Sequence, residues 1–165
     1  MSTMLEAELL AHLDTQLASA RRLLALVLEQ GKAIRAREVD AVLGRLADVQ
    51  TEMGRRGALE QDRAAILQRA GASLGIPATE VTVERLCVLV TPRAGDALRE
   101  RSAELRGLLA EIAREHGINR ALMRQELAFL SHLTRLIGRD TEPGYQAGGS
   151  TGPAAPSHHV LDLQA

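Results

Sequence analysis

The side chains that could carry out catalysis or bind a metal ion are few in this chain, and their spacing suits neither task. None of the five histidines follows a glutamate by three positions, as a di-iron site in a helical bundle requires, and no two are four apart, as in helical zinc sites. Cys87 is the only cysteine, which excludes an internal disulfide and a cysteine-based zinc site. The stretch 71–75 lacks the lysine of a phosphate-binding loop. The sequence predicts a protein that is not an enzyme and holds no metal or cofactor.

Two polar residues within an apolar helical pattern are the best candidates for a specific role. Asn119 and Glu126 are seven positions apart, so on an ideal helix both fall on the same apolar face. A polar residue in a helical seam can set the register of packing at some cost in stability. Alternatively, both side chains could hydrogen-bond a docked peptide, because desolvated polar groups need partners. The sequence leaves both interpretations open, and Glu126 could also lie at the rim of the face.

Tyr145 is a candidate of another kind. It lies between Gly144 and Gln146 in a stretch rich in glycine and proline, where a core position is not expected. A tyrosine there offers a large apolar ring and a hydroxyl group on a flexible strand, which are the properties of a docking anchor. The alternative is that this side chain has no role.

The segment that positions Asn119 and Glu126 is a long amphipathic stretch from Asp96 to Ile137. Before Asn119 its apolar residues fill an arc of roughly 100° on a helical wheel, and after it they fill roughly 180°. A narrow arc is typical of a helix with one neighbour, whereas a wide arc indicates a second partner. The residues of the wide arc are Leu122, Met123, Leu127, Phe129, Leu130, Leu133, Leu136 and Ile137.

Two more long helices are expected before this segment. Apolar residues recur three and four apart from Leu5 to Ile34, and a second helix runs from about Val39 to Ala70. Only a short polar interruption separates them, so one unbroken helix is the rival interpretation. Gly54 and Gly57 in the second helix suggest a local bend or a close approach of another helix. Glycines and a proline at 71–77 then end it.

A short helix capped by Thr79 or Thr82 should lead to Thr91-Pro92, a cap followed by a proline at the first position of the last long helix. That helix should close at Gly138. The predicted fold is therefore all-α: an elongated antiparallel bundle of three long helices and one short one, with coiled-coil-like packing. The predicted domains are a helical domain at 1–139 and a flexible Gly/Pro-rich tail at 140–165.

Composition limits the classes of partner. The chain has 165 residues, of which 45% are hydrophobic but only Phe129 and Tyr145 are aromatic, which suits helix packing and not a sheet. The formal charge is −1, so we expect no nucleic-acid partner and no attraction to an anionic membrane. No signal peptide and no apolar run long enough to span a bilayer is present, and we expect a cytoplasmic protein without membrane insertion.

These features together resemble a known family. The order is a long Leu-rich helix with Leu9 and Leu13, a turn near residues 38–40, a second helix, and a connector before the helix that contains Asn119-Arg120-Ala121-Leu122-Met123. A Tyr-x-x-x-Gly element, Tyr145 to Gly149, follows that helix. The chain thus resembles the FlgN family, the cytoplasmic export chaperones of the bacterial flagellum, over nearly its whole length.

The resemblance implies a function and a set of partners. FlgN-like proteins bind hook-associated proteins, prevent their premature assembly and deliver them to the flagellar type III export gate; their clients present C-terminal helical segments. Such a segment would bind the last long helix, and Tyr145 with Gly149 would dock at the export gate. The predicted client-binding residues are Asn119, Leu122, Met123, Glu126, Leu127, Phe129, Leu130, Leu133 and Ile137.

A different class of function explains the wide arc equally well. The protein could be a structural homodimer in which the wide apolar arc packs against a second copy and no client exists. In the client interpretation, residues 23–28 of the first helix would form an opposite wall if the first and last helices ran antiparallel.

Overall fold

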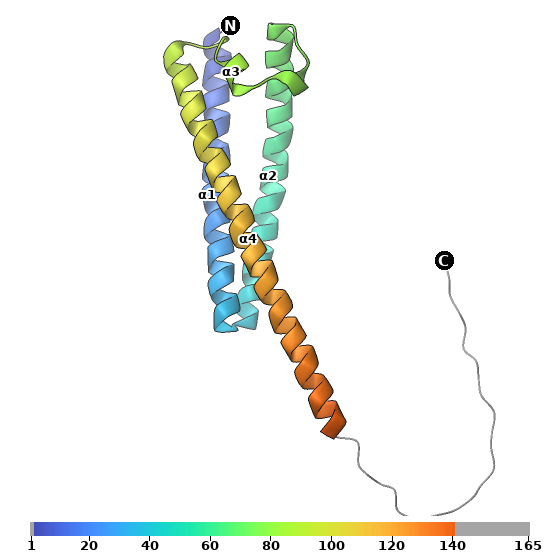
Figure 1. The fold of residues 1–165 in the computed structure, drawn as a ribbon. Coiled ribbons are helices and arrows are strands. Elements are labelled where there is room, and N and C mark those ends of the chain that lie inside the picture. The colour runs from blue at the N-terminus through green and yellow to red at the C-terminus, as the bar shows by residue number, and fades with distance from the viewer. Residues whose placement is uncertain (1, 141–165) are drawn as a thin grey trace, which may run out of the picture. The chain divides into compact units, whose positions relative to one another are not determined.

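The computed structural model describes residues 2–140, and every regular element within that range is helical, which confirms the all-α prediction (Figure 1). Chain contacts divide the protein into two units, residues 1–129 and residues 130–165, and only residues 130–140 of the second unit are described. The elements are α1 (Ser2–Ala36), α2 (Val39–Leu74), the short 3-10 helix η1 (Ala78–Glu80), α3 (Val83–Leu86) and α4 (Pro92–Asp140).

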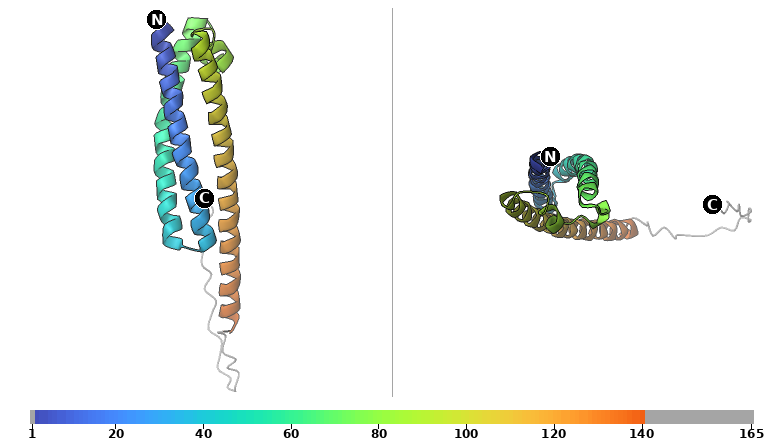
Figure 2. Two further views of the ribbon diagram at one scale, coloured as in Figure 1. Left: turned by 90° about the vertical axis from the view of Figure 1, so that its left-hand side faces the viewer. Right: turned by 90° about the horizontal axis from the view of Figure 1, so that it is seen from above.

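Side-chain pairs fix the direction of the three long helices within the first unit. As residue numbers rise along α1, the numbers of the partner residues on α2 fall, so α1 and α2 are antiparallel. The numbers of the partner residues at the start of α4 and along it rise, so α1 and α4 are parallel (Figures 1 and 2). Three helices joined by two reversals must leave the first and third parallel. The defining pairs are Glu8–Arg69, Gln16–Glu60 and Ser19–Glu52 for α2, and Glu6–Thr91, Asp14–Arg101 and Arg37–Glu126 for α4.

The turn between α1 and α2 excludes the single unbroken helix. Arg37 has a φ of 58°, and the backbone N–H groups of Arg37 and Glu38 donate to the carbonyls of Ile34 and Ala33 at 3.1 Å each. This is the Schellman motif that ends many helices. Its left-handed position usually holds glycine, because a side chain there costs about 1–2 kcal/mol. An arginine in that position explains why the sequence carried no clear turn signal.

The second reversal follows the predicted chemistry. Gly75, with a φ of 68°, ends α2 in another Schellman motif, in which the N–H of Ile76 donates to the Gly71 carbonyl at 3.0 Å. The Thr82 hydroxyl accepts from the Arg85 N–H and caps α3, and the Thr91 hydroxyl accepts from the Ala94 N–H and caps α4. The predicted short helix is thus two pieces: η1 begins at Ala78 and contains Thr79, and α3 begins directly after its cap, Thr82.

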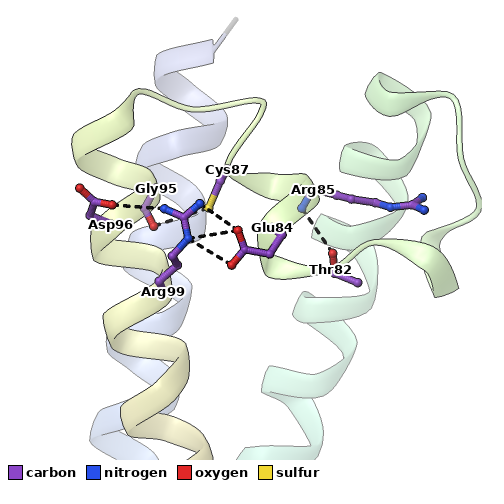
Figure 3. Close-up of polar contacts among 7 residues, drawn as sticks. All are labelled: Thr82, Glu84, Arg85, Cys87, Gly95, Asp96 and Arg99. Carbon is purple, nitrogen blue, oxygen red and sulfur yellow. Dashed lines mark hydrogen bonds and ion pairs between the residues drawn. The ribbon is translucent and has the colours of Figure 1, made fainter.

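The connector between α2 and α4, residues 75–91, is bound to the start of α4 by charged groups (Figure 3). Glu84 on α3 accepts two hydrogen bonds from Arg99 Nε at 3.1 Å each and one from Nη2 at 2.8 Å, while Arg99 Nη1 donates to Asp96 at 3.2 Å. The Cys87 thiol donates to the Gly95 carbonyl at 3.6 Å. Hydrogen bonding to Glu84 raises the pKa of Arg99, and the bonds from Arg99 lower the pKa of Glu84. The charged pair therefore stays ionised at neutral pH.

The buried core of the first unit has two parts. Leu9, Ile66, Ala70, Leu86 and Leu98 join α1, α2, α3 and α4 near the connector. Farther along α1, a second cluster is formed by Leu23, Val27 and Val49, with Ile112 packed against it. The predicted wall at residues 23–28 is therefore wrong, because it required α1 and α4 to be antiparallel and they are parallel. The buried residues of this stretch, Leu23 and Val27, already pack in the core.

The predicted bend or close approach at Gly54 and Gly57 is not found. α2 is continuous through both positions, and a Cβ added at either would meet nothing within 4 Å. Both glycines lie on an exposed face of the helix. Their effect is therefore the ordinary loss of helix propensity, about 1 kcal/mol each relative to alanine.

Candidate functional site

A row of exposed apolar side chains follows the C-terminal part of α4. Leu127 and Phe129 are the last of these in the first unit, and four more lie in the second unit. Large apolar side chains in succession at 36–65% exposure are unusual for a helix that has finished packing. We call this set the exposed α4 surface: Leu127, Phe129, Leu130, Leu133, Leu136 and Ile137.

The spacing of this set matches a helix-binding face. Phe129 and Leu133 are four positions apart, and Leu133 and Leu136 are three apart. Leu130 directly follows Phe129, and Ile137 directly follows Leu136. Side chains spaced in this way lie on one side of a helix and can pack against a second helix. The surface is thus suited to an amphipathic helical partner.

The other predicted client residues within the described range are less accessible. Leu122 and Met123 are half-buried. The Glu126 side chain is 40% exposed and accepts a hydrogen bond at 3.4 Å from Nη2 of Arg37, which lies in the turn after α1. An exposed ion pair of this kind contributes about 0–1 kcal/mol. These three residues therefore lie at the transition between the packed part of α4 and the exposed α4 surface.

Asn119 is buried against α1. It is 1% exposed, and its Nδ2 donates to the Val27 carbonyl at 2.8 Å and to Gln30 Oε1 at 3.4 Å. Both partners belong to the chain itself, so the amide is already satisfied without a docked peptide. Of the two interpretations of Asn119, the geometry favours the one in which this side chain sets the register between α1 and α4.

Gly31 is required by the position of Asn119. A Cβ at Gly31 would lie 2.7 Å from Asn119 Oδ1, closer than real side chains approach. The sequence contained a signal for this contact: in the three-and-four pattern of α1, Gly31 is the one position without a side chain. The pattern alone did not show which helix comes close there.

A second buried polar cluster joins α1 and α2. Glu52 is 2% exposed and accepts from Ser19 Oγ at 2.7 Å, from Arg22 Nη2 at 3.2 Å and from Arg55 Nη1 at 3.2 Å. Burial acts to raise the pKa of Glu52, but hydrogen bonds from Ser19, Arg22 and Arg55 outweigh it and lower the pKa. The buried carboxylate is therefore ionised at neutral pH and acts as a structural anchor.

The first unit contains a groove that the sequence did not predict. It has a volume of about 900 Å³, with α2 and α4 as its walls, α1 as its floor and α3 with its flanking residues at one end. Its apolar lining comes from all of these elements: Leu9, Leu13, Ile66, Leu67, Val81, Val83, Leu86, Leu98, Leu105 and Leu109. We call it the α2–α4 groove.

Two polar atoms in this groove are buried without a hydrogen-bond partner. They are Gln16 Oε1 on α1 and Arg56 Nη1 on α2, the two such side-chain atoms found among the described residues. Gln16 is only 2% exposed, and its Nε2 contacts Glu60 Oε1 and His12 Nε2 at 3.4 Å each. Burial lowers the pKa of His12, so its ring is largely uncharged at pH 7. An acceptor and a donor thus lie unused in an apolar hollow.

Other features that could indicate chemistry are absent from the part of the chain that the structure describes. Within residues 2–140 no three His, Cys, Asp or Glu side chains lie close enough together to hold a metal ion. None of the described helices combines the length and the apolar character needed to cross a membrane. Tyr145 and Gly149, predicted to dock at the export gate, lie outside the described residues.

Comparison with known proteins gives one match. The model of the family described as FlgN protein matches residues 1–153. Searches of curated proteins and of solved structures returned no match. The family match covers nearly all of the chain, including every described helix, and agrees with the resemblance in the sequence. The chain therefore belongs to the FlgN family of flagellar export chaperones, which bind hook-associated proteins.

Proposed function

We propose that the exposed α4 surface captures the C-terminal helical segment of a hook-associated protein. The client is held in this way until it is delivered to the flagellar type III export apparatus, and its premature assembly is prevented. The proposal needs no catalysis and no cofactor. Capture takes place in the cytoplasm, where the client is synthesised.

One observation carries the proposal: apolar side chains from Leu127 to Ile137 are exposed at helical spacing. The energetic cost of leaving such residues in water is about 25 cal/mol for each Å² of apolar surface. A client helix that covers them with its own apolar face regains that free energy, as in other complexes in which a helix packs against an apolar surface. Leu122, Met123 and Glu126 would extend the contact at its N-terminal end.

The expected affinity is moderate, which suits delivery. A disordered segment that folds when it binds loses about 2–5 kcal/mol of the interaction free energy in becoming ordered. The client could therefore be released by exchange at the export gate without nucleotide hydrolysis. Tyr145 and Gly149 are proposed to take part in that docking step.

The test is a binding measurement with purified hook-associated proteins, intact and lacking the C-terminal helix. We expect the intact proteins to bind and the truncated ones to lose binding. Leu130→Asp combined with Leu133→Asp should weaken binding at least about tenfold, because charges would enter an apolar interface. Leu43→Asp combined with Leu46→Asp on α2 is the matched control, since both are exposed leucines three positions apart, and this variant should bind normally. Binding that is indifferent to the truncation or to the α4 pair would refute the proposal.

A role for Tyr145 can be separated from capture. Tyr145→Ala should leave client affinity unchanged while reducing export of the client by living cells. Loss of client affinity in this variant would instead place the tyrosine in the client contact.

The alternative, a structural homodimer, rests on the same exposed α4 surface. Light scattering after size-exclusion chromatography distinguishes the two. A monomer whose mass rises by one client on mixing supports the chaperone. A tight dimer that is abolished by the α4 pair of substitutions and binds no client would support the structural role.

A further inference from the structure

The α2–α4 groove contains charge that the chain itself does not balance. Two acid–base pairs lie on its walls, Glu60 with Arg63 on α2, and Glu84 on α3 with Arg99 on α4. The two remaining arginines of the lining, Arg56 and Arg106, have no acidic partner among the described residues. The groove thus carries two uncompensated positive charges above an apolar floor.

These two arginines lie toward the same end of the groove. Arg56 is the groove residue of α2 farthest from the turn at Gly75, and Arg106 is near the end of the groove stretch that α4 contributes from Leu98 to Leu109. They belong to opposite walls. A carboxylate entering between the walls there would therefore approach a guanidinium from either side, and Arg56 Nη1 is a donor that has no partner.

The length of the groove matches a short helix. The stretch from Leu98 to Leu109 spans eleven residue steps of α4, which is about 16 Å or three helical turns. Apolar lining on three sides fits the apolar face of an amphipathic helix. The unused acceptor Gln16 Oε1 fits a hydroxyl or amide donor on that face, because a buried acceptor without a partner is unfavourable.

We propose that the α2–α4 groove is a second docking site, distinct from the exposed α4 surface, and that it binds an acidic amphipathic helix of a partner protein. Apolar side chains of that helix contact the floor, and a carboxylate pairs with Arg56 and Arg106. A basic helix is rejected at this site because its charges would be desolvated beside two guanidinium groups. All residues of the site belong to the first unit.

The test uses two synthetic 15-residue peptides with identical leucine positions at helical spacing and either glutamate or lysine at the polar positions. Fluorescence anisotropy with the full-length chain should show saturable binding of the acidic peptide at least about tenfold tighter than that of the basic one. Equal affinities, or no saturable binding of the acidic peptide, would overturn the proposal.

Charge reversal locates the site. Arg56→Glu with Arg106→Glu should weaken binding of the acidic peptide at least about tenfold and strengthen binding of the basic one. Arg93→Glu with Arg120→Glu is the matched control: both residues are exposed, both lie outside the groove, and the change in net charge is the same. Equal loss in both double variants would show a long-range charge effect and refute the assignment.

Two further variants separate this site from stability and from client capture. Gln16→Leu should raise the thermal unfolding midpoint or leave it unchanged, since it removes an unsatisfied polar atom. The same substitution should weaken the binding of a peptide that carries serine among its leucines. Leu130→Asp with Leu133→Asp should leave acidic-peptide binding unchanged. Loss of peptide binding in this last variant would place the peptide on the exposed α4 surface and refute a second site.

Discussion

The two stretches of α4 are built from the same residue types but differ in what they contact. From Ala94 to Asn119 the helix lies along α1, with Leu98 only 1% exposed and Asn119 hydrogen-bonded to α1. From Leu127 to Ile137 leucine is even more frequent, yet the large apolar side chains of this stretch are 36–65% exposed. An apolar helical pattern therefore indicates that a partner is needed, and among the described residues the chain buries leucine side chains of α4 only in the first stretch.

The largest expected difference between the stretches is in stability. Leu98→Ala should lower the free energy of unfolding by about 2–5 kcal/mol, because it removes a fully buried side chain from the cluster around Leu9 and Ile66. Leu130→Ala should change it by less than about 0.5 kcal/mol, because Leu130 is 56% exposed. Urea denaturation followed by circular dichroism measures both. Similar losses for both variants would show that the exposed α4 surface is covered in solution.

Alanine substitutions at two glycines should change the free energy of unfolding by smaller amounts, and the two changes should have opposite signs. Gly31→Ala should cost about 1–3 kcal/mol because its Cβ would lie 2.7 Å from Asn119 Oδ1. Gly107→Ala, on α4 with nothing within 4 Å of the new Cβ, should instead stabilise the protein by up to about 1 kcal/mol through helix propensity. Thermal unfolding of both variants gives the comparison.

The double variant Gly31→Ala with Asn119→Ala tests the cause of the Gly31 effect. Removing the amide also removes the clash, so the two changes together should cost less than the sum of their separate costs. Strict additivity would mean that Asn119 does not set the contact between α1 and α4.

The smallest expected effect concerns pH. The folded-state pKa of Glu52 lies below its ordinary value near 4.5, so the contribution of Glu52 to stability is fully present above that value and is lost as the pH falls through the lowered pKa. The unfolding midpoint of the wild type should therefore fall on acidification below about pH 4.5. The Glu52→Gln variant should be less stable than the wild type at pH 7, and its unfolding midpoint should fall less steeply on acidification. An unchanged slope would exclude Glu52 as a source of acid sensitivity.

Sequence patterns were enough to predict the helices and most of their ends. Glycine at position 75 and threonine at 82 and 91 act locally, through left-handed backbone geometry and side-chain capping, and such effects do not depend on distant residues. The turn at Arg37 was only weakly indicated, because an arginine takes the position that glycine usually occupies. The wide apolar arc after Asn119 indicated a second partner, which stays a prediction; the structure shows that large apolar side chains of this arc are exposed.

Only the tertiary structure decided which side chains have partners. Asn119 and Glu126 look alike in the pattern, but one is buried against Val27 and the other forms an exposed ion pair with Arg37. The α2–α4 groove is lined by residues from four separate parts of the chain, and its unpaired atoms become visible only when those parts are placed together. The physical reason is that periodicity records how many sides of a helix are apolar, whereas burial and hydrogen bonding depend on the direction and register of the neighbouring helices.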